Sequence, residues 1–347
     1  MANLLRATPH VTIPGLLVPQ TQNAIWKDYL GAKLSYGEYK DDYAYIPTIS
    51  AMSSNTFVGQ QWGKNLANQQ YAIGQVQTAF YNIEAFVEWN YQEQEKFNGL
   101  IDGVALQDFL TNLAEQGINQ KMHQAILYGF DNENNDTLGQ GILSNATMGN
   151  LPQDSNKNTT LTAYNPSELL NWLISCARQI TTNTYSLAQP VVIASSVRVV
   201  RLLQSILVPL TQFANSANLP GFNNSIGSLA SVAGVYDAVV GGMLGVGKIK
   251  WVQDNLLLSP TADGNDTILF IAPEIKVQDE MGEDSSNLVG KKNSINYNTF
   301  FTSVGGGKQR FENTPNMGWY GFKMVAKTTA GVNLRQETVL QVPVKFS

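Results

Sequence analysis

The chain has 347 residues, which suggests about two domains and is enough to bury a full core without disulfides. Only 14% of the residues are charged, the net charge is −5, and no Lys/Arg-rich stripe occurs, which argues against a dedicated nucleic-acid-binding protein. The single cysteine, Cys176, excludes an internal disulfide. It lies in the apolar run LLNWLISCARQI, where we expect a buried and unreactive thiol. The sequence holds no apolar run of about 18 residues, so we expect no membrane span.

Residues 1–46 predict an extended arm rather than a self-sufficient domain. Three prolines are scattered through the first half, and aromatic residues cluster in the second half. Such rings require a neighbouring surface on which to pack. Four of the clustered aromatic residues are the anchors that we expect in contacts between subunits: Trp26, Tyr29, Tyr36 and Tyr43.

Residues 47–92 predict a long two-stranded hairpin. Apolar and polar positions alternate around Val76, which is the period of a strand. An isolated hairpin is only marginally stable in water, so this one also requires a partner. The anchors that we expect on it are Phe57, Trp62 and Tyr71.

Residues 103–128 predict one long helix that acts as a strut. Apolar residues recur at three- and four-residue steps, Asp102 can cap the start, and Gly129 can supply the left-handed stop. Helical spacing predicts a length of roughly 37 Å for 25 residues. The apolar residues of the stripe are Leu106, Leu110, Leu113, Ile118, Met122, Ala125 and Ile126. We expect His123 to be packed or hydrogen-bonded on this helix.

A polar linker at 146–164 leads into a middle section of mixed helices and strands. Asn165-Pro166-Ser167 has the signature of a helix start, and apolar residues follow at helical spacing. PVVIAS predicts a buried strand, VRVVRLLQSIL a helix, and KIKWVQDNLLL and DTILFIAPE further strands. Residues 214–247 are rich in Asn, Gly and Ser and predict an exposed loop or rim. The last fifty residues predict two strands separated by a turn at Ala330-Gly331.

Candidate catalytic chemistry is sparse. With two histidines and one cysteine, the sequence has few residues that could form a transition-metal site or an activated nucleophile. Gly242, Gly247 and Lys248 match the spacing of a phosphate-binding loop, but Ile249 replaces the hydroxyl residue that would bind magnesium. We therefore interpret this stretch as a glycine-rich loop. Carboxylates at Glu88, Glu93 and Glu95 are more typical of a solvated helix start than of an acid–base pair.

The order of these elements resembles a tailed-phage major capsid protein, a fold shared with encapsulins. The resemblance covers nearly the full chain and rests on order and spacing: arm, hairpin, long spine helix, mixed middle section and returning strands. In that family a Gly-Leu-Leu-Asn-type tag follows the spine helix. Here Gly141, Ile142, Leu143 and Asn145 occupy that place, with Ser144 inserted.

The resemblance implies an α+β fold with a peripheral domain at 93–164 and 295–347, whose spine helix is 103–128, and an axial domain at 165–294. It implies a structural protein without a cofactor, which self-assembles as hexamers and pentamers into the icosahedral head shell of a virion. The shell would be assembled in the bacterial host cytoplasm and would enclose double-stranded DNA without sequence-specific binding. Further partners could be scaffolding, portal or decoration proteins.

Three other hypotheses remain open at this stage. The first is the shell of an encapsulin-like bacterial compartment. The second is a tail or neck component of a phage. The third is a nucleotide-binding enzyme that uses the stretch from Gly242 to Lys248.

Overall fold

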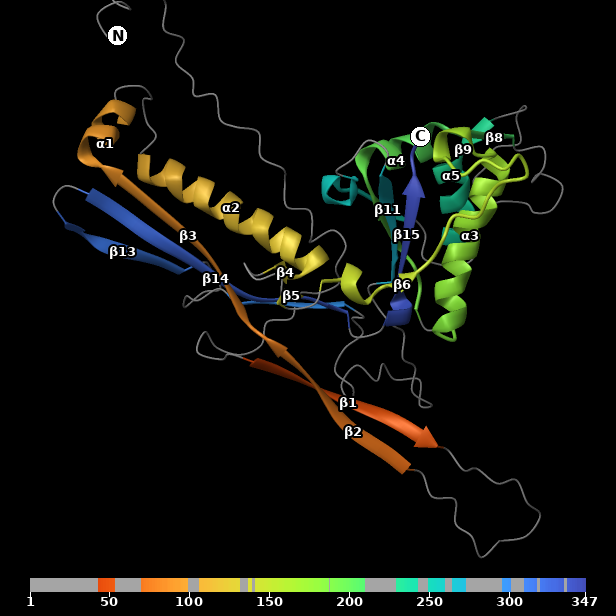
Figure 1. Ribbon diagram of the computed structural model, residues 1–347, viewed down its shortest axis with the longest axis horizontal. Coiled ribbons are helices and arrows are strands. Elements are labelled where there is room, and N and C mark those ends of the chain that lie inside the picture. Colours follow the sequence, from red (N-terminus) through yellow and green to blue (C-terminus); the bar gives the residue numbers. More distant parts are fainter. Residues whose placement is uncertain are drawn as a thin grey trace, which may run out of the picture. The chain divides into compact units, whose positions relative to one another are not determined.

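A computed structural model describes thirteen stretches of the chain (Figure 1). They are residues 43–53, 70–98, 106–131, 137–138, 141–186, 188–209, 229–242, 249–259, 264–272, 295–300, 309–316, 319–333 and 336–347. The described residues form two compact units. The first contains those between 82 and 122 and between 300 and 327, and the second contains the others.

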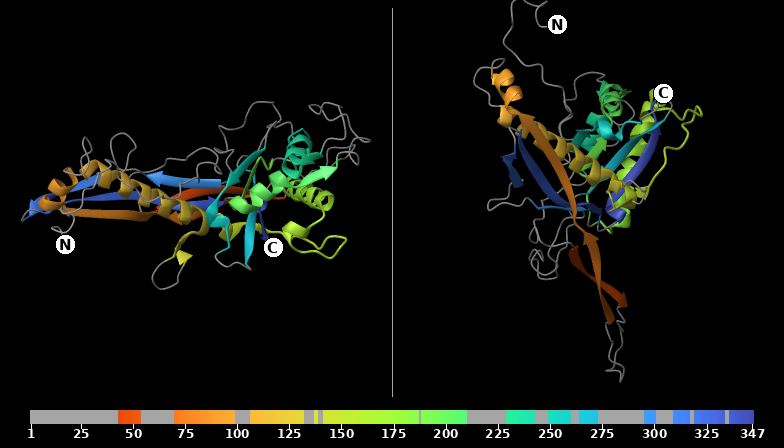
Figure 2. Two further views of the ribbon diagram at one scale, coloured as in Figure 1. Left: turned by 90° about the horizontal axis from the view of Figure 1, so that it is seen from above. Right: turned by 60° about the vertical axis from the view of Figure 1, so that its left-hand side comes forward.

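Two strands form an antiparallel pair where the sequence predicts a hairpin. β1 (Tyr43–Ser53) pairs with β2 (Gln70–Ala79), and the register places Tyr43 opposite Ala79 and Ala51 opposite Tyr71. The register shifts between Ala51 and Ser53. Figures 1 and 2 show the pair as a twisted ribbon, as expected for two strands without a third.

The first unit combines strands with the long helix. Its elements are β3 (Tyr81–Asn90), α1 (Tyr91–Asn98), α2 (Leu106–Tyr128) as far as Met122, β13 (Gln309–Asn316) and the first part of β14 (Trp319–Asn333). β14 lies between β12 (Ile295–Phe300) and β13, and β3 also pairs with β14. Side chains alternate along β3, where Ile83 and Trp89 are buried while Glu84, Phe86 and Glu88 are exposed. In both figures α2 runs alongside β3.

The predicted spine helix is confirmed as a single α-helix of 23 residues. Five of the seven residues of its predicted apolar stripe are buried, namely Leu106, Ile118, Met122, Ala125 and Ile126, while Leu110 and Leu113 are half-buried. The helix ends at Gly129, whose φ of 86° lies in the left-handed region that favours glycine.

The second unit is built on a five-stranded sheet with the order β10-β7-β11-β15-β6. The strands are β10 (Lys250–Gln253), β7 (Val192–Ser195), β11 (Asn265–Ile271), β15 (Val339–Lys345) and β6 (Thr147–Met148). β10 runs parallel to β7, and β11 is antiparallel to both β7 and β15. All four residues of β7 are buried, as the predicted interior strand requires.

Helices pack on this sheet and complete the core of the second unit. They are α3 (Pro166–Asn183), α4 (Val197–Ser205) and the short α5 (Val232–Tyr236). α3 begins as predicted, because Asn165 is its N-cap and accepts a hydrogen bond from the amide of Ser167. The predicted apolar positions of α3 are buried, and Trp172 packs edge-on against Phe270 of β11.

The remaining elements are short. Two further strand pairs are β4 (Phe130–Asp131) with β5 (Thr137–Leu138), and β8 (Leu207–Pro209) with β9 (Leu229–Ser231). The single-turn helices are Leu143–Asn145, Leu161–Ala163, Asn255–Leu257 and Gln336–Thr338, and a π-helical turn covers Asp237–Gly241.

Three local predictions are wrong. The expected exposed rim at 214–247 contains buried helix, since Val232, Val235 and Tyr236 are part of the core. The expected turn at Ala330-Gly331 is absent, because β14 continues through both residues to Asn333. KIKWVQDNLLL is a strand only as far as Gln253, after which the chain turns at Asn255–Leu257.

Candidate functional site

Two of the seven predicted interface anchors lie in the described part of the chain. Tyr43 begins β1 and is 52% exposed, and Tyr71 lies in β2. Tyr45 was not among the predicted anchors, yet it is 56% exposed and stands two positions along the same strand as Tyr43, hence on the same face. The alternation Tyr43-Ala44-Tyr45 was the signal that could have identified it. The other five anchors, Trp26, Tyr29, Tyr36, Phe57 and Trp62, lie outside the described residues.

The first unit also exposes an aromatic side chain. Phe86 on β3 is 55% exposed, between the exposed carboxylates of Glu84 and Glu88. Nζ of Lys323 on β14 lies 2.6 Å from a carboxylate oxygen of Glu84. A single exposed apolar side chain is ordinary on a protein surface, so Phe86 does not by itself mark a contact surface.

The predicted solvated helix start is present at α1. The side chain of Asn90 accepts a hydrogen bond from the amide of Glu93, and the carboxylate of Glu93 accepts one from the amide of Asn90. This reciprocal pair is a capping box. Glu93 therefore has a structural role, and the exposed side chain of Glu95 pairs with the hydroxyl of Tyr91.

His123 is buried and hydrogen-bonded, as predicted. Its Nε2 lies 2.8 Å from Oδ2 of Asp254, and the exposed fractions of the two side chains are 2% and 0%. The other carboxylate oxygen of Asp254 accepts a hydrogen bond from the amide of Leu256. Burial lowers the pKa of His123 to about 4, so the imidazole is neutral at neutral pH. The pair joins the C-terminal end of α2 to the turn that follows β10.

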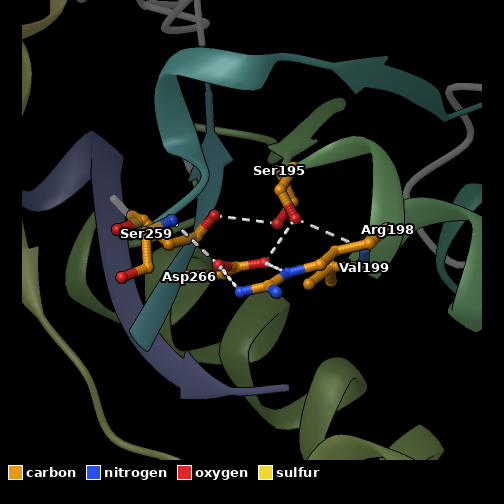
Figure 3. A network of polar contacts seen from close by, with 7 residues as sticks. Ser195, Arg198, Val199, Ser259 and Asp266 are labelled. Carbon is orange, nitrogen blue, oxygen red and sulfur yellow. Dashed lines mark hydrogen bonds and ion pairs between the residues drawn. The ribbon is translucent and has the colours of Figure 1, made fainter. Parts of the chain in front are cut away.

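A second buried carboxylate, Asp266, organises the start of α4 (Figure 3). Arg198 donates two hydrogen bonds to it, from Nε at 2.7 Å and from Nη2 at 2.6 Å. The Ser196 hydroxyl and the Ser259 amide donate two more. Burial acts to raise the pKa of Asp266, but these donors outweigh it and hold the pKa below its usual value. These four hydrogen bonds favour an ionised carboxylate, and this carboxylate ties α4 to β11.

Asp154 is the centre of a third polar cluster, in the predicted linker. Its carboxylate accepts hydrogen bonds from the amides of Asn156, Asn158 and Asn165 and from the side chain of Asn158. Asn165 is also the N-cap of α3, so this turn fixes where the helix begins. Like the other two clusters, it is occupied by internal contacts.

The described residues give little support to catalysis or metal binding. They contain no group of three or more His, Cys, Asp or Glu residues that could hold a metal ion. Cys176 is buried, and burial raises the pKa of its thiol to about 12, which confirms the expected unreactive cysteine. Within the same stretches, no helix combines the length and apolar character that crossing a bilayer requires.

The near-match to a phosphate-binding loop begins in helical conformation. Gly242 follows the π-helical turn and has a helical φ of −67°. A phosphate-binding loop follows a strand and precedes a helix, so the chain before Gly242 has the wrong structure for it. Gly247 and Lys248 lie outside the described residues.

An open groove of about 570 Å³ lies in the second unit. Its lining residues come from the end of α4, from β9 and α5, from the π-helical turn and from the start of β10: Gln204, Ser231, Ala233, Gly234, Asp237, Ile249, Lys250 and Trp251. The Trp251 indole donates a hydrogen bond of 2.8 Å to Asp237, which fixes the ring at the groove.

Comparison with known proteins gives a likeness of fold without a likeness of sequence. The sequence matches no protein-family model and no curated protein. The structure matches the capsid of Myoviridae phage XM1 with a TM-score of 0.68 at 9% identity, covering 99% of this chain and 98% of the other. It matches the capsid of an empty GTA particle with a TM-score of 0.55 at 7% identity, covering 96% and 100%.

An encapsulin has the same arrangement. The match to the holo-SrpI encapsulin complex from Synechococcus elongatus PCC 7942 has a TM-score of 0.52 at 9% identity, covering 99% of this chain and 95% of the other. Likeness over the full length of each chain confirms the expected mixture of helices and sheets in this order. The chain therefore has the fold of phage capsid proteins and encapsulins.

Proposed function

We propose that this chain is the major capsid protein of a tailed phage, which self-assembles into the icosahedral head shell around a double-stranded DNA genome. The observation that carries the proposal is the match to the capsid of Myoviridae phage XM1 over 99% of this chain and 98% of the other. The role is structural rather than enzymatic, and it needs no cofactor. The location is the virion, after assembly in the host cytoplasm.

In this proposal the chain has four functional parts. Residues 1–46 are an arm and residues 47–92 an extended hairpin, and both overlap neighbouring subunits. Residues 93–164 and 295–347 form a peripheral domain around the spine helix. Residues 165–294 form an axial domain that gathers at the centre of each hexamer or pentamer.

The physical basis of assembly is a surface poor in charge and rich in rings. Only 14% of the residues are charged, so few charges lose their water when copies meet. Exposed Tyr43 and Tyr45 supply amphipathic contact area on β1, where the arm leads into the hairpin. Many weak symmetric contacts of this kind sum to a closed container.

The remaining partners follow from the same role. A net charge of −5 suits a container that encloses DNA without adhering to it. Scaffolding, portal and decoration proteins are the further partners that a phage head would use.

A second candidate is the shell of an encapsulin-like compartment, favoured by the match to the Synechococcus elongatus complex. The contents of purified shells distinguish the phage head from the encapsulin-like compartment. Double-stranded DNA of uniform length supports the phage head, whereas a single enriched protein cargo supports the compartment. Rings or tubes instead of closed shells would indicate a tail or neck component.

Deletion of residues 1–46 tests the proposed assembly contacts. We expect a folded, soluble protein that forms no shells, because the aromatic anchors of the arm are lost. Electron microscopy of the purified variant measures this, and shells of normal yield would refute the role of the arm.

A double substitution tests the two exposed tyrosines of β1 in the same way. Tyr43→Ala combined with Tyr45→Ala should reduce shell yield, because both rings are exposed on one face of β1. Tyr185→Ala is the matched control, since this ring is 88% exposed and lies outside the hairpin. Equal shell yields from the two variants would show that the two tyrosines of β1 are not part of the interface.

A further inference from the structure

No described strand pairs with the outer edge of β10. In the described part of the second unit, β10 is the last strand of its sheet and pairs only with β7. The amides of Lys250 and Asp254 donate to the carbonyls of Val191 and Ser195, each at 2.8 Å. Successive peptide groups of a strand point to opposite sides, so the N–H and C=O groups of Trp251 and Gln253 point away from the sheet. Such an edge is a template for another strand.

The groove described above lies at the start of this edge, where Ile249 leads into β10. Ile249, Lys250 and Trp251 all line it, although successive side chains of a strand point to opposite faces of the sheet. A groove that touches consecutive residues with side chains on both faces reaches the edge of the strand at this point. The facing wall is mostly small and polar, with Ser231 and Gly234 among its residues, so an extended backbone can approach closely.

The groove carries one charge of each sign, Asp237 and Lys250. Because these two charges sum to zero, the groove offers no net attraction for a charged peptide, and a charged side chain would lose its water as it covers the groove, which is costly. The groove therefore fits an extended, uncharged peptide that pairs through its backbone and places small apolar side chains beside Trp251.

We propose that the edge of β10 binds residues 10–20 of a second copy of this chain, HVTIPGLLVPQ, as an added strand. The proposal rests on the assembly proposed above, and it names one contact by which the arm of one subunit joins the next. Strand addition of this type gains its affinity mainly from main-chain hydrogen bonds.

Three properties of the segment favour it as the occupant. It contains no Asp, Glu, Lys or Arg, and its Val, Ile and Thr residues favour strands. Prolines at 14 and 19 are compatible with an added strand, because a residue before proline favours extended backbone and proline is tolerated in a strand that pairs on one side only. Two other uncharged stretches outside the described residues, 54–63 and 210–228, are richer in Asn, Gly and Ser, which favour turns over strands.

The length of the arm permits contact with a neighbour. About 22 residues separate Gln20 from Tyr43, where β1 begins, and in extended form they span roughly 70 Å. That reach is larger than a small domain of about 100 residues, whose radius of gyration is about 13 Å.

A disulfide cross-link between two full-length chains tests the contact directly. One tagged version carries Gln204→Cys on the exposed groove wall, and a co-expressed version with another tag carries Val11→Cys or Thr12→Cys, so that either face of the added strand is sampled. Buried Cys176 does not compete. We expect oxidation to link the two tags, with roughly tenfold more dimer than from a Tyr185→Cys control, because a bound segment has a high effective concentration.

Two outcomes of this experiment would overturn the proposal. One is an equal yield of dimer from the groove cysteine and the Tyr185→Cys control. The other comes from a third version that carries both cysteines in one chain: a link that forms only within this chain, and never between the two tags, would place the segment on its own subunit.

A matched pair of variants tests the main-chain pairing. Gln253→Pro removes an N–H group that points away from β7 and leaves the ladder between β10 and β7 intact, while Gln253→Ala keeps this N–H group. We expect the proline variant to lose the cross-link and most of the shell yield, and the alanine variant to keep both. If the proline variant cross-links as well as the alanine variant, no strand is added at this edge.

The yield of shells and the yield of cross-link together distinguish a failure of the strand addition from a failure of the capsid role. Normal shells without the cross-link would refute the strand addition and leave the capsid role standing. An unsubstituted chain that forms no particle at all would refute the capsid role itself.

Discussion

At the residue scale, three buried carboxylates determine where the elements of the second unit meet. Asp154, Asp254 and Asp266 are each at most 5% exposed, and each accepts hydrogen bonds from groups on other turns or elements. Their partners can be far away in sequence, as for His123 and Asp254, which are 131 residues apart. Such pairs could not be predicted from the sequence, because no local pattern connects the two segments.

Removing the Asp266 carboxylate tests the most heavily bonded of these contacts. Asp266→Asn should lower the free energy of unfolding by about 2–4 kcal/mol, because Arg198 and Ser196 lose the charged acceptor between them. Denaturant titration of the disassembled chain measures this loss. Arg198→Gln is the complementary variant and should cost at least as much, because it leaves the buried carboxylate of Asp266 without its cation, whereas Arg198 is 31% exposed and can be solvated in Asp266→Asn. An unchanged free energy of unfolding in Asp266→Asn would show that this network does not stabilise the fold.

The contribution of Asp266 also depends on pH. Its pKa is lower in the folded chain than the usual 3.8, so the unfolded chain takes up the proton first as the pH falls. The stabilisation is complete well above pH 3.8 and is lost as the pH falls through the folded pKa. The difference in the free energy of unfolding between the original chain and Asp266→Asn should therefore shrink as the pH falls below 3.8.

His123 predicts an acid-sensitive stability in a different window. Its pKa is about 4 when folded and 6.5 in its ordinary state, so the unfolded chain binds the proton first between these values. Stability is fully present above pH 6.5 and should decrease by about 1–3 kcal/mol as the pH falls to 4. Melting temperatures of the original chain and of His123→Gln across this range measure it. Identical slopes for both chains would show that His123 does not titrate there.

At the element scale, the end of the spine helix depends on a close approach of two backbones. A Cβ on Gly141 would lie 2.3 Å from the carbonyl oxygen of Leu127 and 2.5 Å from the amide nitrogen of Gly129. The amide of Ile142 donates to the carbonyl of Ile126 at 2.9 Å. The segment after the helix thus folds back onto the last turn of α2, which only glycine at 141 permits.

Two glycine substitutions in and beside the spine helix should have opposite effects. Gly141→Ala should destabilise the chain by about 3 kcal/mol, because the backbone must move. Gly117→Ala is the matched control on the exposed side of α2, where no atom lies within 4 Å of the new Cβ, and it should stabilise the helix by about 0.5–1 kcal/mol. Thermal unfolding of both variants measures the difference. A tolerated Gly141→Ala would contradict the tight packing at the helix end.

Elements with strong local signals were predictable from the sequence, and elements that depend on distant partners were not. α2 and α3 have apolar stripes, a cap at Asn165 and a stop at Gly129. The run VAGVYDAVV was missed because glycine and serine surround it, although tertiary packing buries Tyr236 completely. β14 continues through Gly331 because neighbouring strands stabilise it, which the local turn signal does not reveal.

At the scale of the whole molecule, the fold was predictable from the order of its elements, whereas the contacts between copies were not. Tyr43 and Tyr45 show that the described hairpin exposes rings, and the five anchors outside the described residues remain predictions. The open edge of β10 came only from the structure, because the sequence does not show which strand is outermost in a sheet.

The central claim is that copies of this chain complete one another in a closed shell. Analytical ultracentrifugation and electron microscopy of the purified full-length chain test it most directly. We predict closed particles of uniform size that sediment far faster than a protein of 38.0 kDa. A chain that sediments as a single compact monomer at every concentration, with no particles on the grid, would contradict the account.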